Sequence, residues 1–263
     1  MDLGLKHRVA IVAAASRGLG YAVAHELAAE GARVVICARS AEPLEAARRE
    51  LVKATNGDVR AIAADLSTTA GIDAVAAEAE RAYGPVDILV NNTGGPPSGP
   101  FEQHDWAAWQ GAVDLLLRSS VELTRRVLPG MRARQWGRVL NVTSIAVKQP
   151  VDGLILSNAI RAAVTGFART LANEVARDGV TVNSIMPGYT RTERVEQLAR
   201  ATAARDGVTE AEVLARFESQ IPMRRLGEPR EFGALAAFLV SERASYITAQ
   251  SFAVDGGWIR SLL

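Results

Sequence analysis

A serine and an arginine are spaced by one helical turn in the second half of the chain. Ser157 and Arg161 would share one face of a helix and could act together. An alkyl hydroxyl is a far weaker acid than a phenol, and a guanidinium does not give up its proton. The pair therefore predicts hydrogen bonding to a bound molecule, not proton transfer. A helix N-cap at Ser157 and Asn158 is the favoured structural alternative.

Two titratable side chains near this pair could handle a proton. Lys148 lies in a predicted loop, and Tyr189 directly follows a Pro-Gly turn. Burial could tune either group for catalysis, whereas the structural alternative makes them surface or lid residues. The three histidines do not cluster and no two acids have metal-ligand spacing, so the sequence predicts no metal site.

A glycine-containing turn follows the first apolar run and precedes a helical stretch. Glycines in such a turn let phosphates approach the N–H groups of a helix N-terminus, where the helix dipole favours an anion. The predicted pyrophosphate contacts are Ser16, Arg17, Gly18, Leu19 and Gly20. Ala14 would narrow the turn without blocking it if its φ is negative. An ordinary strand-to-helix turn is the alternative for this motif alone.

The end of the second predicted strand indicates which dinucleotide binds. A carboxylate there would bond the 2′-hydroxyl of NAD and repel a 2′-phosphate. The chain instead has Cys37-Ala38-Arg39-Ser40, and Arg39 with Arg17 offers two guanidinium groups to a phosphate. NADP (NADPH) is therefore predicted in preference to NAD. A solvated surface charge is the alternative for Arg39.

Short runs of Val, Ile and Ala alternate with helix-length segments. Because the runs are apolar throughout, they predict strands that helices cover on both faces of a sheet. The predicted strands are Arg8–Ala13, Arg33–Ala38, Val59–Ala64, Val86–Asn91, Arg138–Thr143, Val180–Met186 and Ser251–Val254. The fold class is thus α/β, a single Rossmann-type doubly wound parallel sheet over 1–263. The segment 189–228 is predicted to form a helical lid, with helices near Val195–Ala204 and Glu210–Ser219.

Composition narrows the possible partners and compartment. Thirty basic and 29 acidic residues give a formal charge of +1, which predicts no nucleic-acid or membrane partner. The single cysteine, Cys37, excludes an internal disulfide and is predicted to be a small buried residue. No apolar stretch has signal-peptide or transmembrane length, so a cytoplasmic protein is predicted.

Five motifs in order resemble the short-chain dehydrogenase/reductase family. They are Ala14-Ala15-Ser16-Arg17-Gly18-Leu19-Gly20, Asp65-Leu66, Asn91-Asn92-Thr93-Gly94, Val142-Thr143-Ser144 and Pro187-Gly188, and the resemblance runs from about Lys6 to Asp255-Gly256-Gly257. It implies that Asp65 and Leu66 meet the adenine and that Asn92, Thr93 and Gly94 line the adenosine-side ribose. It further implies that Pro187 and Gly188 flank the nicotinamide and that Thr192 contacts its carboxamide.

The same resemblance implies four catalytic positions. The family uses a serine that binds the substrate carbonyl, a tyrosine that moves the proton, a lysine that binds ribose and an asparagine that anchors a water. Ser144 matches the serine, whereas Ser157, Arg161 and Leu116 stand at the positions of the other three. Arg161 is expected to keep the lysine's contact with the nicotinamide ribose but not its part in proton transfer.

Three functions follow from these residues. The leading hypothesis is an oxidoreductase that transfers a hydride to or from an unknown small molecule, with Ser144 polarising the acceptor and Lys148 or Tyr189 handling the proton. The alternative is a catalytically silent nucleotide-binding subunit or sensor. A 3-ketoacyl reductase ranks third, because Gln135 and Asp178 stand near positions where such reductases present basic residues to an acidic carrier.

Association is predicted from two helical segments. The stretches Val113–Met131 and Ala159–Leu171 carry small or apolar residues on more than one face. A helix that packs only against the core of its own chain needs one such face. In the family that these motifs resemble, the corresponding helices build dimers and tetramers. A homotetramer with twofold interfaces is therefore predicted.

Overall fold

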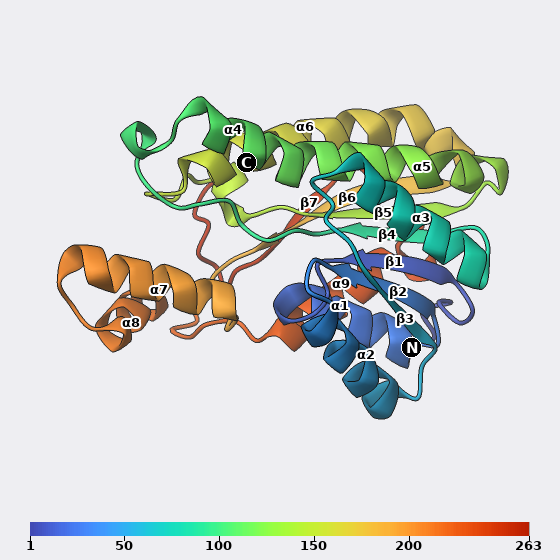
Figure 1. Cartoon of the computed structure of the whole chain (residues 1–263), viewed down its shortest axis with the longest axis horizontal. Helices are drawn as coiled ribbons and strands as arrows, with labels where there is room; N and C mark the ends of the chain where they lie inside the picture. The colour runs from blue at the N-terminus through green and yellow to red at the C-terminus, as the bar shows by residue number, and fades with distance from the viewer. Residues whose placement is uncertain (263) are drawn as a thin grey trace.

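The computed structural model describes residues 1–262, which form one seven-stranded parallel sheet in the order β3-β2-β1-β4-β5-β6-β7 (Figure 1). Every neighbouring pair is parallel. The strands are β1 (Val9–Ala13), β2 (Arg33–Ala38), β3 (Val59–Ala63), β4 (Ile88–Asn91), β5 (Gly137–Val142), β6 (Val180–Pro187) and β7 (Ser251–Val254). The predicted fold class is confirmed, and strand ends differ from the prediction by at most two residues.

Two helical layers cover the sheet (Figure 1). One face carries α1 (Gly18–Ala29), α2 (Ala41–Thr55) and α9 (Pro229–Leu239), and its core includes Val23, Leu27 and Phe232. The other carries α3 (Thr69–Tyr83), α5 (Ser119–Ala133) and α6 (Ile155–Val175), with Ile72, Leu123 and Leu171 in the core. Helices on both faces explain why the strands are apolar along their whole length.

The segment predicted as a lid forms two helices. These are α7 (Glu193–Asp206) and α8 (Glu210–Gln220), which lie together at one end of the molecule, outside both layers (Figure 1). A parallel bridge between Thr190 and Gly227 joins the start of the segment to its end. Both helices include the predicted ranges: α7 extends its range by two residues at each end, and α8 extends its range by one residue at the C-terminal end.

The helix before β5 is interrupted. It begins as α4 (Trp106–Ala112), widens into a π-helical segment over Val113–Arg118 and continues as α5. Single-turn π segments often accompany functional sites, and this one contains Leu116, which is buried against Leu156 and Ile160.

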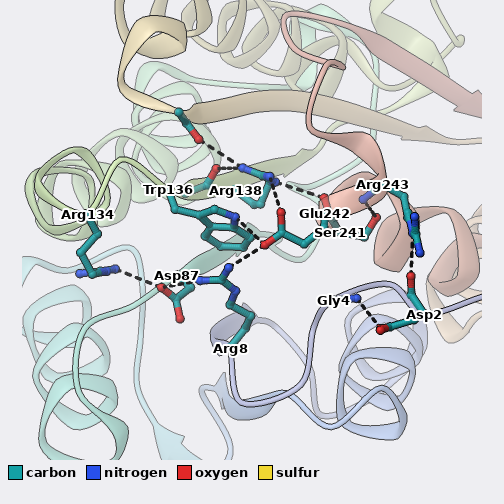
Figure 2. Close-up of polar contacts among 12 residues, drawn as sticks. Asp2, Gly4, Arg8, Asp87, Arg134, Trp136, Arg138, Ser241, Glu242 and Arg243 are labelled. Atoms are coloured by element: carbon teal, nitrogen blue, oxygen red, sulfur yellow. Dashed lines mark hydrogen bonds and ion pairs between the residues drawn. The ribbon is translucent and has the colours of Figure 1, made fainter.

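A cluster of charged side chains closes the amino end of the sheet (Figure 2). Arg8 and Arg138 stack on the ring of Trp136, with guanidinium carbons 3.6 and 4.3 Å from its centroid. Glu242 accepts hydrogen bonds from Arg8 Nη2 at 2.6 Å and from Trp136 Nε1 at 3.0 Å. These contacts join the starts of β1 and β5 to the segment after α9.

In the described part of the chain no helix is both long and apolar enough to cross a bilayer.

Candidate functional site

The predicted pyrophosphate turn is built at the carboxyl end of β1. Ala14 adopts a left-handed φ of 49°, and Gly18 one of 60°. The condition of a negative φ at Ala14 is therefore not met: the chain keeps a backbone shape that glycine favours and accepts the strain of a methyl group there. The tight turn also explains Gly20, because a Cβ at that position would lie 2.3 Å from the carbonyl oxygen of Ala14.

Asn92 holds this turn from the next strand in the sheet. Its Nδ2 donates to the carbonyl oxygens of Ala13 at 3.2 Å and Ala14 at 3.4 Å. Strand order reverses between β1 and β4, which is the point where open α/β sheets bind ligands. The neighbouring Thr93 is half-buried, and a Cβ on Gly94 would meet nothing within 4 Å. Gly94 therefore borders open space beside the turn.

The N-terminus of α1 is free to bind an anion. Arg17 is its N-cap residue and makes no side-chain capping bond, and the first turn carries no acid. Unpaired backbone N–H groups and the helix dipole both favour a phosphate there. The residues present thus fit the diphosphate of a dinucleotide.

The first lid residues close over this turn. The guanidinium of Arg17 forms an ion pair with Glu193, and a Cβ on Gly18 would lie 3.5 Å from the methyl group of Thr192. Thr192 Oγ1 donates to the carbonyl oxygen of Thr190 at 3.2 Å. The lid therefore begins in direct contact with the predicted cofactor site.

Arg39 and Asp65 mark the adenosine end of the site. Arg39 is exposed just after β2, and its charge helps to lower the pKa of Asp65. The larger causes of that lowered pKa are hydrogen bonds from Ser67, whose N and Oγ donate to Asp65 Oδ1 at 2.9 and 2.8 Å. Asp65 does not cap the next helix, because Thr68 accepts the capping bond from the N–H of Gly71. Leu66 is buried beside it.

Ser157 and Arg161 are brought together inside α6. The expected N-cap at Ser157 is wrong, because the helix begins at Ile155. Arg161 Nε donates to Ser157 Oγ at 3.3 Å, and its Nη1 donates to the carbonyl oxygen of Val142 at 2.7 Å. Both side chains are buried. Burial, with a smaller effect from the charge of Arg194, lowers the pKa of Arg161 to about 10.

Ser144 follows β5 by two residues and faces the same end of the sheet. Its Oγ accepts a hydrogen bond from the backbone N–H of Ala146 at 3.1 Å, which starts a short 3-10 turn. Because Arg161 bonds Val142 at the end of the same strand, the structure brings Ser144 close to the Ser157 and Arg161 pair in the fold. Lys148 is exposed beyond that turn.

Tyr189, at the start of the lid segment 189–228, packs among aromatic side chains. Its ring stacks on Phe217 with centroids 4.3 Å apart and meets Trp258 edge-on at 6.1 Å. The same apolar cluster contains Ile145, the residue next to Ser144. Burial, and to a smaller extent the charge of Asp152, raises the pKa of the Tyr189 phenol above its usual value.

Backbone contacts fix the Pro187-Gly188 turn. The N–H of Gly188 donates to Val254 at 2.9 Å, and a Cβ on Gly188 would lie 2.7 Å from Asp255 Cα. Only a residue without a side chain fits that approach. The turn is therefore held against the end of β7 at the mouth of the site.

One contact at the site was not predicted. Arg194 Nη2 donates to the carbonyl oxygen of Pro96 at 3.1 Å, and a Cβ on Gly95 would lie 2.7 Å from Arg194 Nε. The second glycine of Gly94-Gly95 makes room for this guanidinium. The sequence signal was the doubled glycine, but nothing in the sequence linked it to Arg194, which lies 98 residues beyond the Pro96 that it contacts.

Comparison with known proteins agrees with this geometry. The family model described as "Enoyl-(Acyl carrier protein) reductase" matches residues 13–259. The chain belongs to the short-chain dehydrogenase/reductase family. A relative from Vibrio cholerae, 3-oxoacyl-[acyl-carrier-protein] reductase, is 35% identical over 97% of this chain and 98% of its own length.

Solved structures of family members extend the likeness. The L-sorbose reductase of Gluconobacter frateurii, complexed with NADPH and L-sorbose, matches with a TM-score of 0.94 and 34% identity over 100% of both chains. Actinorhodin polyketide ketoreductase with NADPH matches with a TM-score of 0.93 and 32% identity over 97% of this chain and 98% of that chain. This short-chain dehydrogenase/reductase is thus an oxidoreductase by family, and NADPH in both relatives supports an NADP-type cofactor.

Proposed function

We propose that the chain is an NADP(H)-dependent reductase of a small molecule that works without the tyrosine and lysine usual in its family. The observation that carries the proposal is the pair inside α6. Arg161 donates to Ser157 and to the carbonyl oxygen of Val142 at the end of β5, and the two residues stand at the positions where the motif spacing expects the tyrosine and the lysine. The fold and the pyrophosphate turn are kept, while the acid–base chemistry is changed.

The cofactor residues follow from the site. The uncapped N-terminus of α1 would hold the diphosphate, and Arg39 would meet the 2′-phosphate. Arg161 would keep the nicotinamide ribose in place, since its guanidinium has donors beyond the two that bond Ser157 and Val142. When bound, the dinucleotide supplies the hydride.

The proton must come from a residue other than Ser157. Ser144 would polarise the acceptor, and the geometry favours Tyr189 over Lys148 as the donor. Tyr189 packs in the cluster that contains Ile145, next to Ser144, whereas Lys148 is exposed. A raised pKa keeps the phenol protonated but makes it a weak acid. Activated C=C or C=N acceptors suit it, because they demand less acid catalysis than a simple ketone.

Two other functions are the competing proposals. A catalytically silent subunit or sensor would bind NADPH and reduce no acceptor. A 3-ketoacyl reductase is favoured by the name of the Vibrio cholerae relative. Against it, Asp178 accepts a hydrogen bond from Arg132 at 2.6 Å, which neutralises a basic residue on the surface where an acidic carrier would be expected to dock.

The quaternary proposal is a homotetramer built on α5 and α6. Small residues of α6 are exposed on the outer face of this helix, namely Ala159, Ala162, Ala163 and Gly166. A Cβ on Gly166 would meet nothing within 4 Å, so a second helix could approach closely there. A cytoplasmic location remains a prediction of the sequence.

Fluorescence titration with NADPH and NADH tests the cofactor proposal. NADPH should bind at least about tenfold more tightly, equivalent to roughly 1.4 kcal/mol, because no carboxylate follows β2. Arg39→Asp should reverse the order, whereas Arg33→Asp at the start of the same strand should leave it unchanged. Equal affinities of the wild type for both dinucleotides would refute the assignment.

A further inference from the structure

The arginines of the lid differ in their partners. Arg191 Nε lies 3.2 Å from Glu228, Arg200 lies 4.0 Å from Glu196, and Arg225 Nη2 lies 2.6 Å from Glu231. These three are exposed, and each has an acid of its own. Arg194 is half-buried and pairs with no acid anywhere in residues 1–262.

Arg194 reaches inward from the first turn of α7. It crosses to the loop after β4, where its only hydrogen bond to the described residues 1–262 is the one to the carbonyl oxygen of Pro96. Gly95 lets the guanidinium lie against the backbone, because any side chain there would collide with it. The position is therefore built into the site and is not that of a solvated surface charge.

A second cation without an acid lies at the same end of the sheet. Arg161 is buried, and within residues 1–262 it bonds only neutral oxygens, those of Val142 and Ser157. The loop that Arg194 contacts runs beside the start of α6, because Gly99 forms a parallel bridge with Leu154 and its N–H donates to the carbonyl oxygen of Gly153 at 2.8 Å. Burial, with a smaller effect from the charge of Arg194, lowers the pKa of Arg161 to about 10. Burying like charges without a counterion is unfavourable, and an anion bound between them would relieve the cost.

We propose that Arg194 and Arg161 bind a carboxylate of the substrate, so that the molecule reduced is an anion. This inference rests on the proposed reductase function. The class is a small unsaturated or imine compound that carries a carboxylate near the double bond. A guanidinium binds a carboxylate through two parallel hydrogen bonds, and both arginines keep N–H groups unused by the protein.

The phosphates of the cofactor are the other possible source of the anion. The diphosphate is expected at the α1 N-terminus, where Arg17 and Thr192 lie. Arg194 points instead to the loop after β4, beside Gly95 and Pro96. The titration at saturating NADPH, described next, distinguishes this source from a substrate carboxylate.

Calorimetric titration with benzoate and its neutral isostere benzamide tests the proposal without requiring turnover. Wild type saturated with NADPH should bind benzoate at least about tenfold more tightly than benzamide, because a charged hydrogen-bonded pair forms only with the acid. Arg194→Gln should abolish that preference and leave NADPH affinity unchanged. Arg191→Gln is the matched control, since Arg191 lies on the same lid but is already paired, and it should keep the preference.

Two further variants test the proposal if the Arg194→Gln protein does not fold. Gly95→Ala keeps both charges but displaces the guanidinium, and it should lower the preference for benzoate. Arg194→Lys keeps the charge without the two-pronged geometry and should give an intermediate preference.

Three results would overturn the proposal. Equal binding of benzoate and benzamide by wild type would show no anion site. Retention of the preference in Arg194→Gln would place the anion elsewhere. Loss of benzoate binding when NADPH saturates the protein would assign the arginines to the cofactor. If the protein binds no NADPH, the proposed function fails, and benzoate titration of the free protein still reports on the two arginines.

Discussion

Arginines gather at both ends of the sheet, and Arg161 and Arg194 at the carboxyl end differ from those at the amino end because they pair with no acid in residues 1–262. There Arg8 bonds Glu242, Arg134 lies 3.3 Å from Asp87, and buried Arg138 lies 4.0 Å from Glu242 (Figure 2). At the carboxyl end Arg161 and Arg194 bond only carbonyl and hydroxyl oxygens. The arginines of the amino-end cluster therefore have countercharges within the chain, whereas Arg161 and Arg194 have none in residues 1–262.

This difference indicates that the paired arginines at the amino end stabilise the fold, whereas Arg161 and Arg194 are placed to bind a ligand. A buried cation without a counterion lowers stability, so its presence calls for another explanation. The carboxyl ends of the strands are where α/β sheets bind ligands, and the ligands proposed for this chain are anions. The amino end faces no such site, and its charges hold the strand starts to the segment after α9.

The largest effect is expected at the amino end. Glu242→Gln removes the acid shared by Arg8 and Arg138, leaves the buried Arg138 without a countercharge, and should lower the free energy of unfolding by about 2 kcal/mol. Urea denaturation measures it. Glu196→Gln, which breaks an exposed pair on α7, should change the value by less than about 0.5 kcal/mol. A loss no larger than that of the control would mean that the cluster does not stabilise the fold.

At the carboxyl end the opposite pattern is expected. Arg161→Met removes a buried cation that has no acid, so stability should stay the same or rise, while NADPH affinity should fall at least about tenfold. Denaturation and fluorescence titration measure the two quantities. The control is Arg169→Met, on the exposed side of the same helix, which should leave NADPH affinity unchanged. A destabilisation as large as that of Glu242→Gln would erase the contrast between the two ends.

The smallest effect concerns strain in the pyrophosphate turn. Ala14→Gly relieves a left-handed backbone that disfavours a Cβ, and should raise the free energy of unfolding by about 1 kcal/mol. Ala13→Gly, in the adjoining strand, should lower it by about 0.5–1 kcal/mol instead. Equal signs for the two substitutions in urea denaturation would contradict this view of the turn.

Much of the fold was predictable because the local sequence agrees with the final structure. The strands Arg33–Ala38 and Ser251–Val254 were predicted to the residue, since a glycine lies two residues before the first run and Asp255-Gly256-Gly257 follows the second. The two lid helices were predicted from their helical pattern. Strand β4 starts later than expected, at Ile88, because Asp87 is taken up in contacts with β1 and Arg134.

The parts that depend on tertiary contacts were not predictable. The left-handed φ of Ala14 is set by the turn and not by alanine's own preference. The N-cap expected at Ser157 is absent because packing starts the helix earlier. The approach of Arg194 to Gly95 joins segments far apart in the sequence, which no local pattern reports.

The central claim is that this reductase lacks the usual proton donor, and Ser157→Tyr combined with Arg161→Lys tests it most directly. The rate of NADPH oxidation with an activated ketone should be low for wild type and rise about a hundredfold or more in the variant, since general acid catalysis contributes that much. Leu116→Asn is better added separately, because Leu116 is buried in an apolar cluster.

The same assay with a conjugated enone and an imine separates the remaining possibilities. Wild type should oxidise NADPH faster with at least one of them than with the ketone. NADPH binding without turnover of any acceptor would favour the silent subunit or sensor. Ketone reduction by wild type at the rate of the Ser157→Tyr and Arg161→Lys variant would contradict the account, because the chain would then need no tyrosine at that position to reduce a carbonyl group.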